Sequence, residues 1–509
     1  MRSLPVTRPR LVVAVVALFT VVAVVFGAAG LGGLSTQGFE DPATQAHRAA
    51  DRYAAATGID SNLTAVVLVH PDGGVTGAAD PRVLAARARL AAVPGVVSVT
   101  PPSVAGNRHS ALLIAAFREG TSQGTDASAL RAAFRGRTDV VVGGAVIANH
   151  DITSIIGQDI GRAEMVAFPV LFLVSLLVFR GVIAALMPVV VGMVAIMGGF
   201  LGLAMANHLT SVSVFATNLV IGLGLGLAVD YALLLVSRYR EEVAVHGHTP
   251  DAVRATLRSA GRSVLFSAVT VAAAMAGLML FPQDFLFSMG LGGLMVALVA
   301  ALVAVSLVPA MLMLLGPRID ALSPRRWRDS LAQRHAAPHT GAWYRLSHLV
   351  MRRALPVTVA AAAVMLALGT PALGIRFTSI DEGVLPTSSP ARVAHDMLRA
   401  DFPDDAADPV RILARAPATP ASGAALARYA ATLGNLPGVA SVSRPQPLRG
   451  GTWLIQAVLA QPPLSAASER AVRDIRRAAA PVPVLVGGRT ATQIDEKASL
   501  ARHLPWRRA

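Results

Sequence analysis

The chain has 509 residues, of which 54% are hydrophobic, and its mean hydropathy of +0.56 is too high for a soluble enzyme of this length. It contains no cysteine, which excludes disulfides, thiolate metal sites and a cysteine nucleophile. The net charge of +15 comes almost wholly from arginines beside apolar runs, which indicates the basic loops of a membrane protein rather than nucleic-acid binding.

Seven apolar segments are long enough, or nearly so, to cross a bilayer, because a spanning helix needs about 20 apolar residues. In chain order they are residues 11–31, 165–179, 182–206, 212–236, 264–281, 285–315 and 355–373. The second segment is short and could begin at Ile160, whereas the sixth is long enough to tilt. The first could be a cleaved signal peptide, but its apolar run is long for one, so we expect a retained span.

Arginines cluster before the first segment, after the second, between the fourth and fifth, and between the sixth and seventh. If the spans alternate, all these clusters lie on one side, which the positive-inside rule makes the cytoplasm. We therefore expect a cytoplasmic N-terminus and a basic cytoplasmic loop at 316–353, either flexible or lying along anionic headgroups. Residues 32–164 and 374–509 are then expected outside the membrane, and 165–315 form a bundle.

The chain contains an internal repeat. VPGVVSV at 93–99 recurs as LPGVASV at 436–442, and VVVGG at 140–144 recurs as VLVGG at 484–488. The offset is about 344 residues each time, so residues 1–165 recur as 345–509.

Both external copies show the same alternation of expected strands and helices. In the first copy we expect strands at 63–69, 95–100, 111–117 and 139–143 and helices at 80–92 and 126–136. In the second we expect strands at 409–414, 438–443, 452–459 and 482–487 and helices at 422–436 and 465–479. The order β-α-β-β-α-β predicts two ferredoxin-like α+β domains.

Five spans follow the first copy, and none follows the second in this chain. The expected fold is an α-helical transmembrane bundle with two extracytoplasmic α+β domains. Parallel repeats of this kind are typical of two-half transporters, and we expect the second membrane half to be missing here.

An aspartate lies inside the fourth apolar segment, in GLGLGLAVDY at 222–231. Residues four apart share a helix face, so Asn218, Gly222, Gly226 and Asp230 form one stripe. The Gly-x-x-x-Gly spacing allows close helix approach, so we expect the stripe to face another helix rather than lipid. A carboxylate enclosed in this way can load and release a proton, which suggests a proton relay.

Other interpretations of this stretch remain. Asp230 could be a structural polar anchor or pair with Arg238 or Arg240, although eight residues of helix separate Asp230 from Arg238 by roughly 12 Å. A dinucleotide-binding glycine loop would need a strand before it and a soluble βαβ unit, and this sequence lies within an apolar helix.

Three hydroxyls are candidates for the same site. The Tyr231 phenol could bond a carboxylate on a neighbouring helix or simply pack at an interface. Ser267 and Thr270, three residues apart in the fifth span, could bond Asp230 or water, or bond their own helix backbone.

Common catalytic and metal-binding motifs are absent from the sequence. His109, His150 and His208 are isolated, and no H-E-x-x-H spacing predicts a metal site. Neither a G-x-S-x-G elbow nor a P-loop occurs, so we expect neither an enzyme nor a cofactor.

At this point the sequence resembles a known family. ATNLVIGLGLGLAVDYALLLVSRYREE at 216–242 closely resembles the fourth-span signature of MMPL transporters, the actinobacterial branch of the RND superfamily. GRSVLFSAVTVAAAMAGLMLFP at 261–282 resembles their fifth span. GGLSTQGFEDP at 32–42 and DEGVLPTSSP at 381–390 resemble the starts of their two porter domains.

This resemblance implies a secondary active transporter of the inner membrane that exports lipids or other hydrophobic molecules, driven by the proton-motive force. Asp230 and Tyr231 match a family Asp-Tyr pair that works with a second pair on the tenth span, and Ser267 lies where the fifth span faces them. The partners implied are a hydrophobic substrate, protons and a second chain that supplies the missing transmembrane half.

Two rival functions remain. A truncated, non-transporting product or lipid-binding scaffold would tolerate Asp230→Asn, whereas a proton-driven exporter would stop. An accessory component of protein export would associate with a translocation channel, which crosslinking would detect.

Overall fold

The computed structural model describes residues 4–27, 30, 34–35, 38–120, 123–320, 342–371, 382–402 and 408–503. Parts of the expected first span, most of the basic loop and the start of DEGVLPTSSP lie outside these residues. The chain forms two compact units. Unit 1 comprises 1–34, 163–277 and 288–378, and unit 2 comprises 35–162, 278–287 and 379–509.

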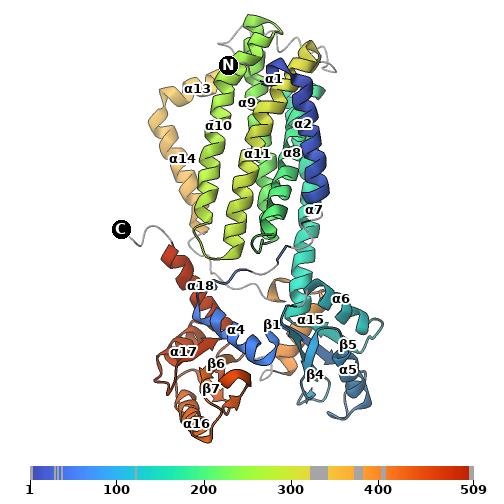
Figure 1. Ribbon diagram of the computed structural model, residues 1–509, viewed down its shortest axis with the longest axis vertical. Helices are drawn as coiled ribbons and strands as arrows, with labels where there is room; N and C mark the ends of the chain where they lie inside the picture. Colours follow the sequence, from blue (N-terminus) through green and yellow to red (C-terminus); the bar gives the residue numbers. More distant parts are fainter. Residues whose placement is uncertain are drawn as a thin grey trace. The chain divides into compact units, whose positions relative to one another are not determined.

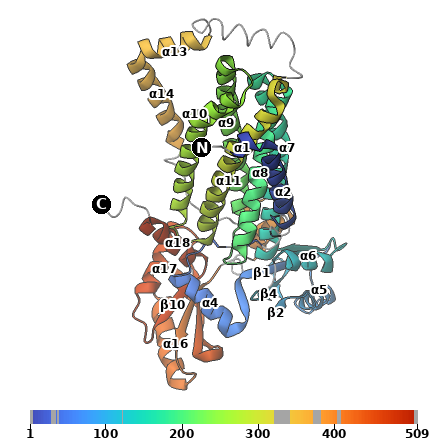
Figure 2. The ribbon, with the colours of Figure 1, turned by 45° about the horizontal axis from the view of Figure 1, so that its top comes forward.

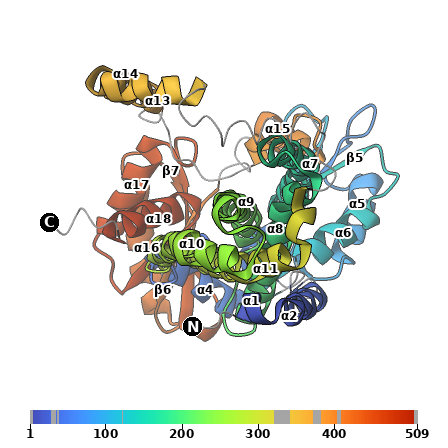
Figure 3. The ribbon, with the colours of Figure 1, turned by 90° about the horizontal axis from the view of Figure 1, so that it is seen from above.

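Unit 1 is a helical bundle (Figures 1 and 3). A short helix, α1 (Leu4–Thr7), precedes the first long one. The long helices are α2 (Pro9–Val22, continued as a π-helical turn, η1, Ala23–Gly27), α7 (Ala145–Phe179), α8 (Val182–Asn207), α9 (Phe215–His246), α10 (Pro250–Leu278) and α11 (Asp284–Leu315). Within the described residues, six helices are long and apolar enough to cross a membrane. A seventh candidate is the bent pair α13 (Ala342–Arg352) and α14 (Ala354–Gly369).

Several helices extend beyond the apolar segments that predicted them. Helix α7 begins at Ala145 in unit 2, well before Met165, and ends in unit 1. Helix α9 continues past Val236 to His246, and α10 begins at Pro250 rather than at Val264. The basic stretch 316–353, expected as a loop, contains the 3-10 turn η2 (Gly316–Asp320) and helix α13. An apolar run marks only the part of a helix suited to lipid, so it does not predict the polar turns by which the helix extends beyond that part.

The bundle packs through small residues of α8, α9 and α11. A Cβ at Gly199 of α8 would lie 2.6 Å from Cγ1 of Val220, and one at Gly292 of α11 would lie 3.0 Å from Cγ2 of the same valine. A Cβ at Gly224 of α9 would lie 2.9 Å from Cγ2 of Val296. Close approach matters in a bilayer because van der Waals packing, rather than exclusion of water, holds the helices together.

Within the described part of this chain, the stripe of α9 expected to face another helix is not the stripe that packs. Gly222 and Gly226 are exposed, and a Cβ at either would meet no atom within 4 Å. The stripe that packs runs along the opposite side through Ala216, Val220, Gly224 and Ala228, all buried. Both stripes carry small residues at a four-residue spacing, so spacing alone could not choose between them.

Unit 2 contains two five-stranded antiparallel sheets. The first has the order β2-β4-β1-β5, with β3 on β4, and the second β10-β6-β9-β7, with β8 on β9. The first copy consists of β1 (Ile59–Val69), α5 (Pro81–Ala91), β2 (Val96–Val99), β3 (Ser103–Val104), β4 (Ala111–Arg118), α6 (Gln123–Ala133) and β5 (Val140–Gly143). The second consists of β6 (Val410–Arg415), α16 (Pro420–Gly434), β7 (Val439–Val442), β8 (Gln446–Pro447), β9 (Thr452–Leu459), α17 (Ala466–Arg477) and β10 (Val484–Gly487), followed by α18 (Arg489–His503). The twelve strands and helices expected from the repeat are all present.

Two helices that the sequence patterns did not predict are exchanged between the copies. Helix α4 (Gln45–Thr57) precedes the first sheet in the chain but packs on the second, where Ala49 meets Leu413 and Leu454. Helix α15 (Pro390–Asp401) precedes the second sheet but packs on the first through Ala394 and Phe402. Figure 1 shows the blue α4 among orange and red elements and the orange α15 beside blue strands.

The repeated motif at the last strand of each copy accommodates this exchange. A Cβ at Gly487 would lie 2.8 Å from Cβ of Ala49, and one at Gly143 would clash with Cβ of Ala394. The next residues, Gly144 and Gly488, adopt φ of +89° and +105°, which disfavour any residue with a side chain. The first glycine of each pair admits the foreign helix, and the second turns the chain into α7 or α18.

An equivalent aspartate then holds each exchanged helix at its start. On α7, Asp151 accepts a hydrogen bond from Ser389 Oγ, the residue before α15 (3.3 Å), and pairs with Arg131. On α18, Asp495 accepts from the backbone N–H of Ala46 in α4 (2.9 Å) and pairs with Arg476 (2.6 Å). A carboxylate is favourable at a helix N-terminus, where backbone N–H groups lack partners.

The two faces of α9 predict opposite effects of one substitution. Gly224→Leu forces a side chain into the contact with Val296 and is expected to destabilise the bundle by about 1–3 kcal/mol. Gly226→Leu on the open face is expected to change stability by less than about 1 kcal/mol. Unfolding of the purified chain in detergent measures both, and equal losses would show that the two faces are packed alike.

Candidate functional site

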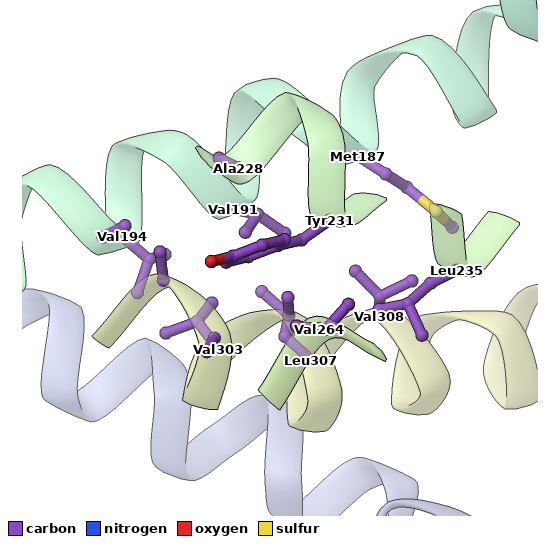
Figure 4. Packing of buried hydrophobic residues seen from close by; sticks show 14 of the residues in the cluster. Met187, Val191, Val194, Ala228, Tyr231, Leu235, Val264, Val303, Leu307 and Val308 are labelled. Carbon is purple, nitrogen blue, oxygen red and sulfur yellow. The ribbon is translucent and has the colours of Figure 1, made fainter. Parts of the chain in front are cut away.

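Helix α9 carries Asp230 and Tyr231 on different faces. Adjacent residues of a helix point about 100° apart, so one of the pair can be exposed while the other is buried. Asp230 is exposed, on the open face of α9 with Gly222 and Gly226, whereas Tyr231 is 3% exposed. Figure 4 shows the Tyr231 ring among apolar side chains that include Val191, Val303 and Leu307.

The Tyr231 hydroxyl lies in this apolar core. Ser267 of α10 is close enough to interact with it, but no hydrogen bond of good geometry to the phenol oxygen occurs among the described residues. A buried hydroxyl without a hydrogen bond costs about 1–3 kcal/mol. The Tyr231 hydroxyl, with Ser267 nearby, is therefore a buried polar group next to the exposed face of α9 that carries Asp230.

The arginines expected as alternative partners of Asp230 have other contacts. Arg238 donates to Ser259 Oγ (3.1 Å) and pairs with Glu241 (2.5 Å) and Glu242 (2.7 Å). Within the described part of the chain, the Asp230 side chain forms neither an ion pair nor a hydrogen bond. Thr270 donates to the carbonyl of Phe266 (2.9 Å), so it bonds its own helix rather than Asp230.

Unit 2 contains a second polar site, which we call the junction. It joins the connector between α10 and α11 to the start of the first copy and to α18. Its buried centre is Asp41, which accepts a hydrogen bond from Ser499 Oγ (2.5 Å), while Gln283 Nε2 donates to the same serine (3.3 Å). Arg502 lies 3.8 Å from Asp41.

Aromatic and backbone contacts reinforce the junction. The rings of Phe39 and Phe285 lie 4.9 Å apart, and Phe285 N–H donates to Gly38 O (3.1 Å). Phe281 lies beside His503, with ring centroids 6.1 Å apart. These contacts attach the first residues of α11 to the same junction.

Ionisable groups in the junction differ in their preferred charge. Burial works against ionisation of Asp41, but hydrogen bonds from Ser499 and Ala43 outweigh it and lower the pKa of this carboxyl. The hydrogen bond to Glu40 (3.1 Å) outweighs burial at His47 and raises the pKa of its imidazole. Burial, with the negative charges of Glu40 and Asp495, raises the pKa of Glu496 to about 7.

The sequence patterns did not identify the junction. Its members come from three distant stretches, and Asp41 and Ser499 are separated by 458 residues. The repeat indicates only the neighbouring Asp495 of α18, which occupies the position that Asp151 occupies in α7.

Together, the bundle with its six helices long and apolar enough to cross a membrane and the duplicated antiparallel sheets are typical of a membrane protein that also carries a repeated α+β domain. The chain belongs to the MMPL family, whose profile matches residues 38–357. Members of this family are transporters rather than enzymes.

Individual relatives agree with this assignment. The membrane protein SCO6666 of Streptomyces coelicolor is 33% identical over 98% of this chain and 70% of that protein. The trehalose monomycolate exporter MmpL3 of Mycolicibacterium smegmatis is 34% identical over 54% of this chain and 29% of that protein. MmpL3 of Mycobacterium tuberculosis is 34% identical over 52% of this chain and 30% of that protein, so both MmpL3 matches cover less than a third of the relative.

Glu496 predicts a pH effect on stability. Its pKa is raised from an ordinary 4.5 to about 7, so its contribution to stability is full below about pH 4.5 and is lost as the pH rises through 7. Glu496→Gln should stabilise the chain at about pH 8 by about 1–2 kcal/mol, after allowance for partial solvent screening, and have little effect at about pH 4.

Chemical unfolding of the full chain at both pH values measures this difference. Glu119→Gln, in an exposed turn, is the matched control and should leave the pH dependence unchanged. Equal behaviour of the two variants would mean that Glu496 is ionised as readily in the folded chain as in the unfolded one.

Proposed function

We propose that this chain belongs to a proton-driven exporter of lipids or other hydrophobic molecules in the inner membrane, with Asp230 as the proton-carrying group. The observation that carries the proposal is an unpaired carboxylate within a helix apolar enough to span the membrane. Intramembrane carboxylates are rare and expensive, and they commonly mark proton pathways.

The open face of α9 supports a requirement for more helices. A charged aspartate facing lipid at the centre of a span costs about 2.5–3.5 kcal/mol. We propose that further transmembrane helices, from the same polypeptide or from a second chain, cover Gly222, Gly226 and Asp230 in the working transporter. The glycines would let a partner helix approach closely, as Gly224 does on the packed side.

Tyr231 and Ser267 act in this proposal as positioning residues. The Tyr231 hydroxyl lies in the apolar core and the half-buried Ser267 of α10 lies near it, so the two hydroxyls lie between α9 and α10. When Asp230 changes charge, the phenol can reorient between the carboxylate and Ser267. Such a movement would connect the protonation of α9 to the position of α10.

The junction is the proposed route from the bundle to the external domains. Helices α10 and α11 are joined by the connector that carries Gln283, and this residue bonds Ser499 of α18. Movement of either helix would then displace α18 and, through the Asp495–Ala46 hydrogen bond, the exchanged helix α4. In this proposal the N-terminus is cytoplasmic, and the two copies in unit 2 are ferredoxin-like porter domains outside the membrane.

The substrate class rests on the relatives. MmpL3 proteins export trehalose monomycolate. We propose a lipid or similarly hydrophobic substrate that enters from the outer leaflet or the periplasm and passes between the two porter domains.

Asp230→Asn tests the proton role, because it keeps the shape of the side chain and removes its titration. The chain is reconstituted in liposomes, with any second chain that copurifies with it. Transbilayer movement of a fluorescent trehalose monoester and internal pH are followed under an imposed pH gradient. The variant should reduce both signals to those of protein-free liposomes.

Asp251→Asn is the matched control, since Asp251 lies at the exposed start of α10 and pairs with Arg254 on the surface (2.6 Å). It should transport as the unaltered chain does. Gradient-driven movement that survives Asp230→Asn would contradict the proton role, and would favour a lipid-binding scaffold or a carrier with another driving force.

A further inference from the structure

We propose that helix α13 lies in the plane of the bilayer surface and binds the headgroups of anionic lipids through Arg345 and Arg352. This interaction surface is separate from the relay and from the porter domains, and it stands whether or not the chain transports.

The first support is the direction of α13. Only Arg353 separates α13 from α14, and the axes of the two helices meet at 96° (Figure 2). Helix α14 is an apolar run of 16 residues with no acidic or basic residue. If α14 enters the hydrocarbon along the bilayer normal, a helix perpendicular to its first turn must run along the membrane surface.

The second support is the distribution of side chains on α13. Leu346, Leu349 and Val350 share one face, since they are three and four residues apart, and they are 49%, 50% and 39% exposed. Arg345, His348 and Arg352 lie on another face at spacings of three and four residues. An apolar stripe beside a cationic one is typical of helices that lie at a membrane interface.

The third support is that no part of unit 1 covers the pair among the described residues. Every described side chain from Arg345 to Arg353 is exposed, and α14 has no buried residue. An uncovered apolar stripe next to a span is expected to meet the lipid that surrounds the span.

Charge selects the kind of lipid. Arg345, Arg352 and Arg353 lie within nine residues, and GAWYRLSHLVMRR at 341–353 contains no acidic residue. Phosphate groups accept bidentate hydrogen bonds from guanidinium groups, and an anionic leaflet adds a net attraction that a zwitterionic one lacks. We therefore commit to anionic phospholipid rather than to lipid in general.

The absence of cysteine allows the depth of single positions to be measured in the full chain. Leu349→Cys on the apolar stripe and His348→Cys beside it are each labelled with a nitroxide, and the chain is placed in nanodiscs. Accessibility to oxygen, which concentrates in lipid, is compared with accessibility to a water-soluble nickel complex. Nanodiscs of phosphatidylcholine alone are compared with nanodiscs containing phosphatidylglycerol.

The label at 349 should favour oxygen and the label at 348 the nickel complex, and phosphatidylglycerol should deepen the label at 349. In the L349C background, the ratio of lipid-exposed to water-exposed label should be higher in nanodiscs with phosphatidylglycerol than in nanodiscs without it. Arg345→Gln with Arg352→Gln should reduce this increase roughly tenfold to thirtyfold, because each arginine near an anionic surface contributes about a fivefold preference. Arg87→Gln with Arg89→Gln, on exposed positions of α5, is the control and should leave it unchanged.

Three results would overturn the proposal. Equal exposure of both labels to the nickel complex would place α13 in water. Shielding of the label at 349 from both reagents, in detergent as in nanodiscs, would mean that protein covers the stripe. An unchanged response to phosphatidylglycerol after loss of both arginines would remove the role of charge.

Discussion

The membrane unit is organised around one constraint, which is that α9 carries a carboxylate on a helix otherwise suited to lipid. The buried side of α9, from Ala216 through Gly224 to Ala228, consists mainly of small residues and lies against α8 and α11. This packing turns the opposite side, with Gly222, Gly226 and Asp230, outward. Tyr231 lies in the core between these two sides, so its hydroxyl lies near Ser267 while the neighbouring Asp230 is exposed.

Outside the bundle, the chain contains two copies of one domain, each built on a small antiparallel sheet. Each small sheet is covered on one face by its own two helices and on the other by a helix from the opposite copy. Paired glycines admit each foreign helix, and equivalent aspartates, Asp151 and Asp495, bind at the start of it. Neither copy can therefore complete its core alone, and the two are expected to fold and to move as a coupled pair.

The sequence predicted the features that depend on local pattern. Apolar runs located the long helices, and the strand and helix patterns within each copy located all twelve of the expected strands and helices, because these signals lie within short stretches of chain. Asp230 was found because an ionisable residue in an apolar run is conspicuous. Its exposure was not foreseen, since Gly222 and Gly226 have the same spacing as residues that do pack.

The features that were missed depend on long-range contact or on a change of direction. Helices α4 and α15 are weakly apolar and short, and nothing in their own sequence shows which sheet they cover. The Asp41–Ser499 hydrogen bond joins two residues that are 458 positions apart. Helix α13 was expected as part of a basic loop, because three arginines hide the apolar stripe formed by Leu346, Leu349 and Val350.

The most direct test of the proton role is to observe the Asp230 carboxyl itself. Infrared difference spectra of the chain in lipid bilayers can be recorded over a pH titration, with Asp230→Asn as the reference that assigns the band. We predict a protonated-carboxyl band that disappears and returns as the pH is cycled and is absent from the variant. Identical spectra for the two proteins, or a band that does not respond to pH, would contradict a proton-carrying Asp230.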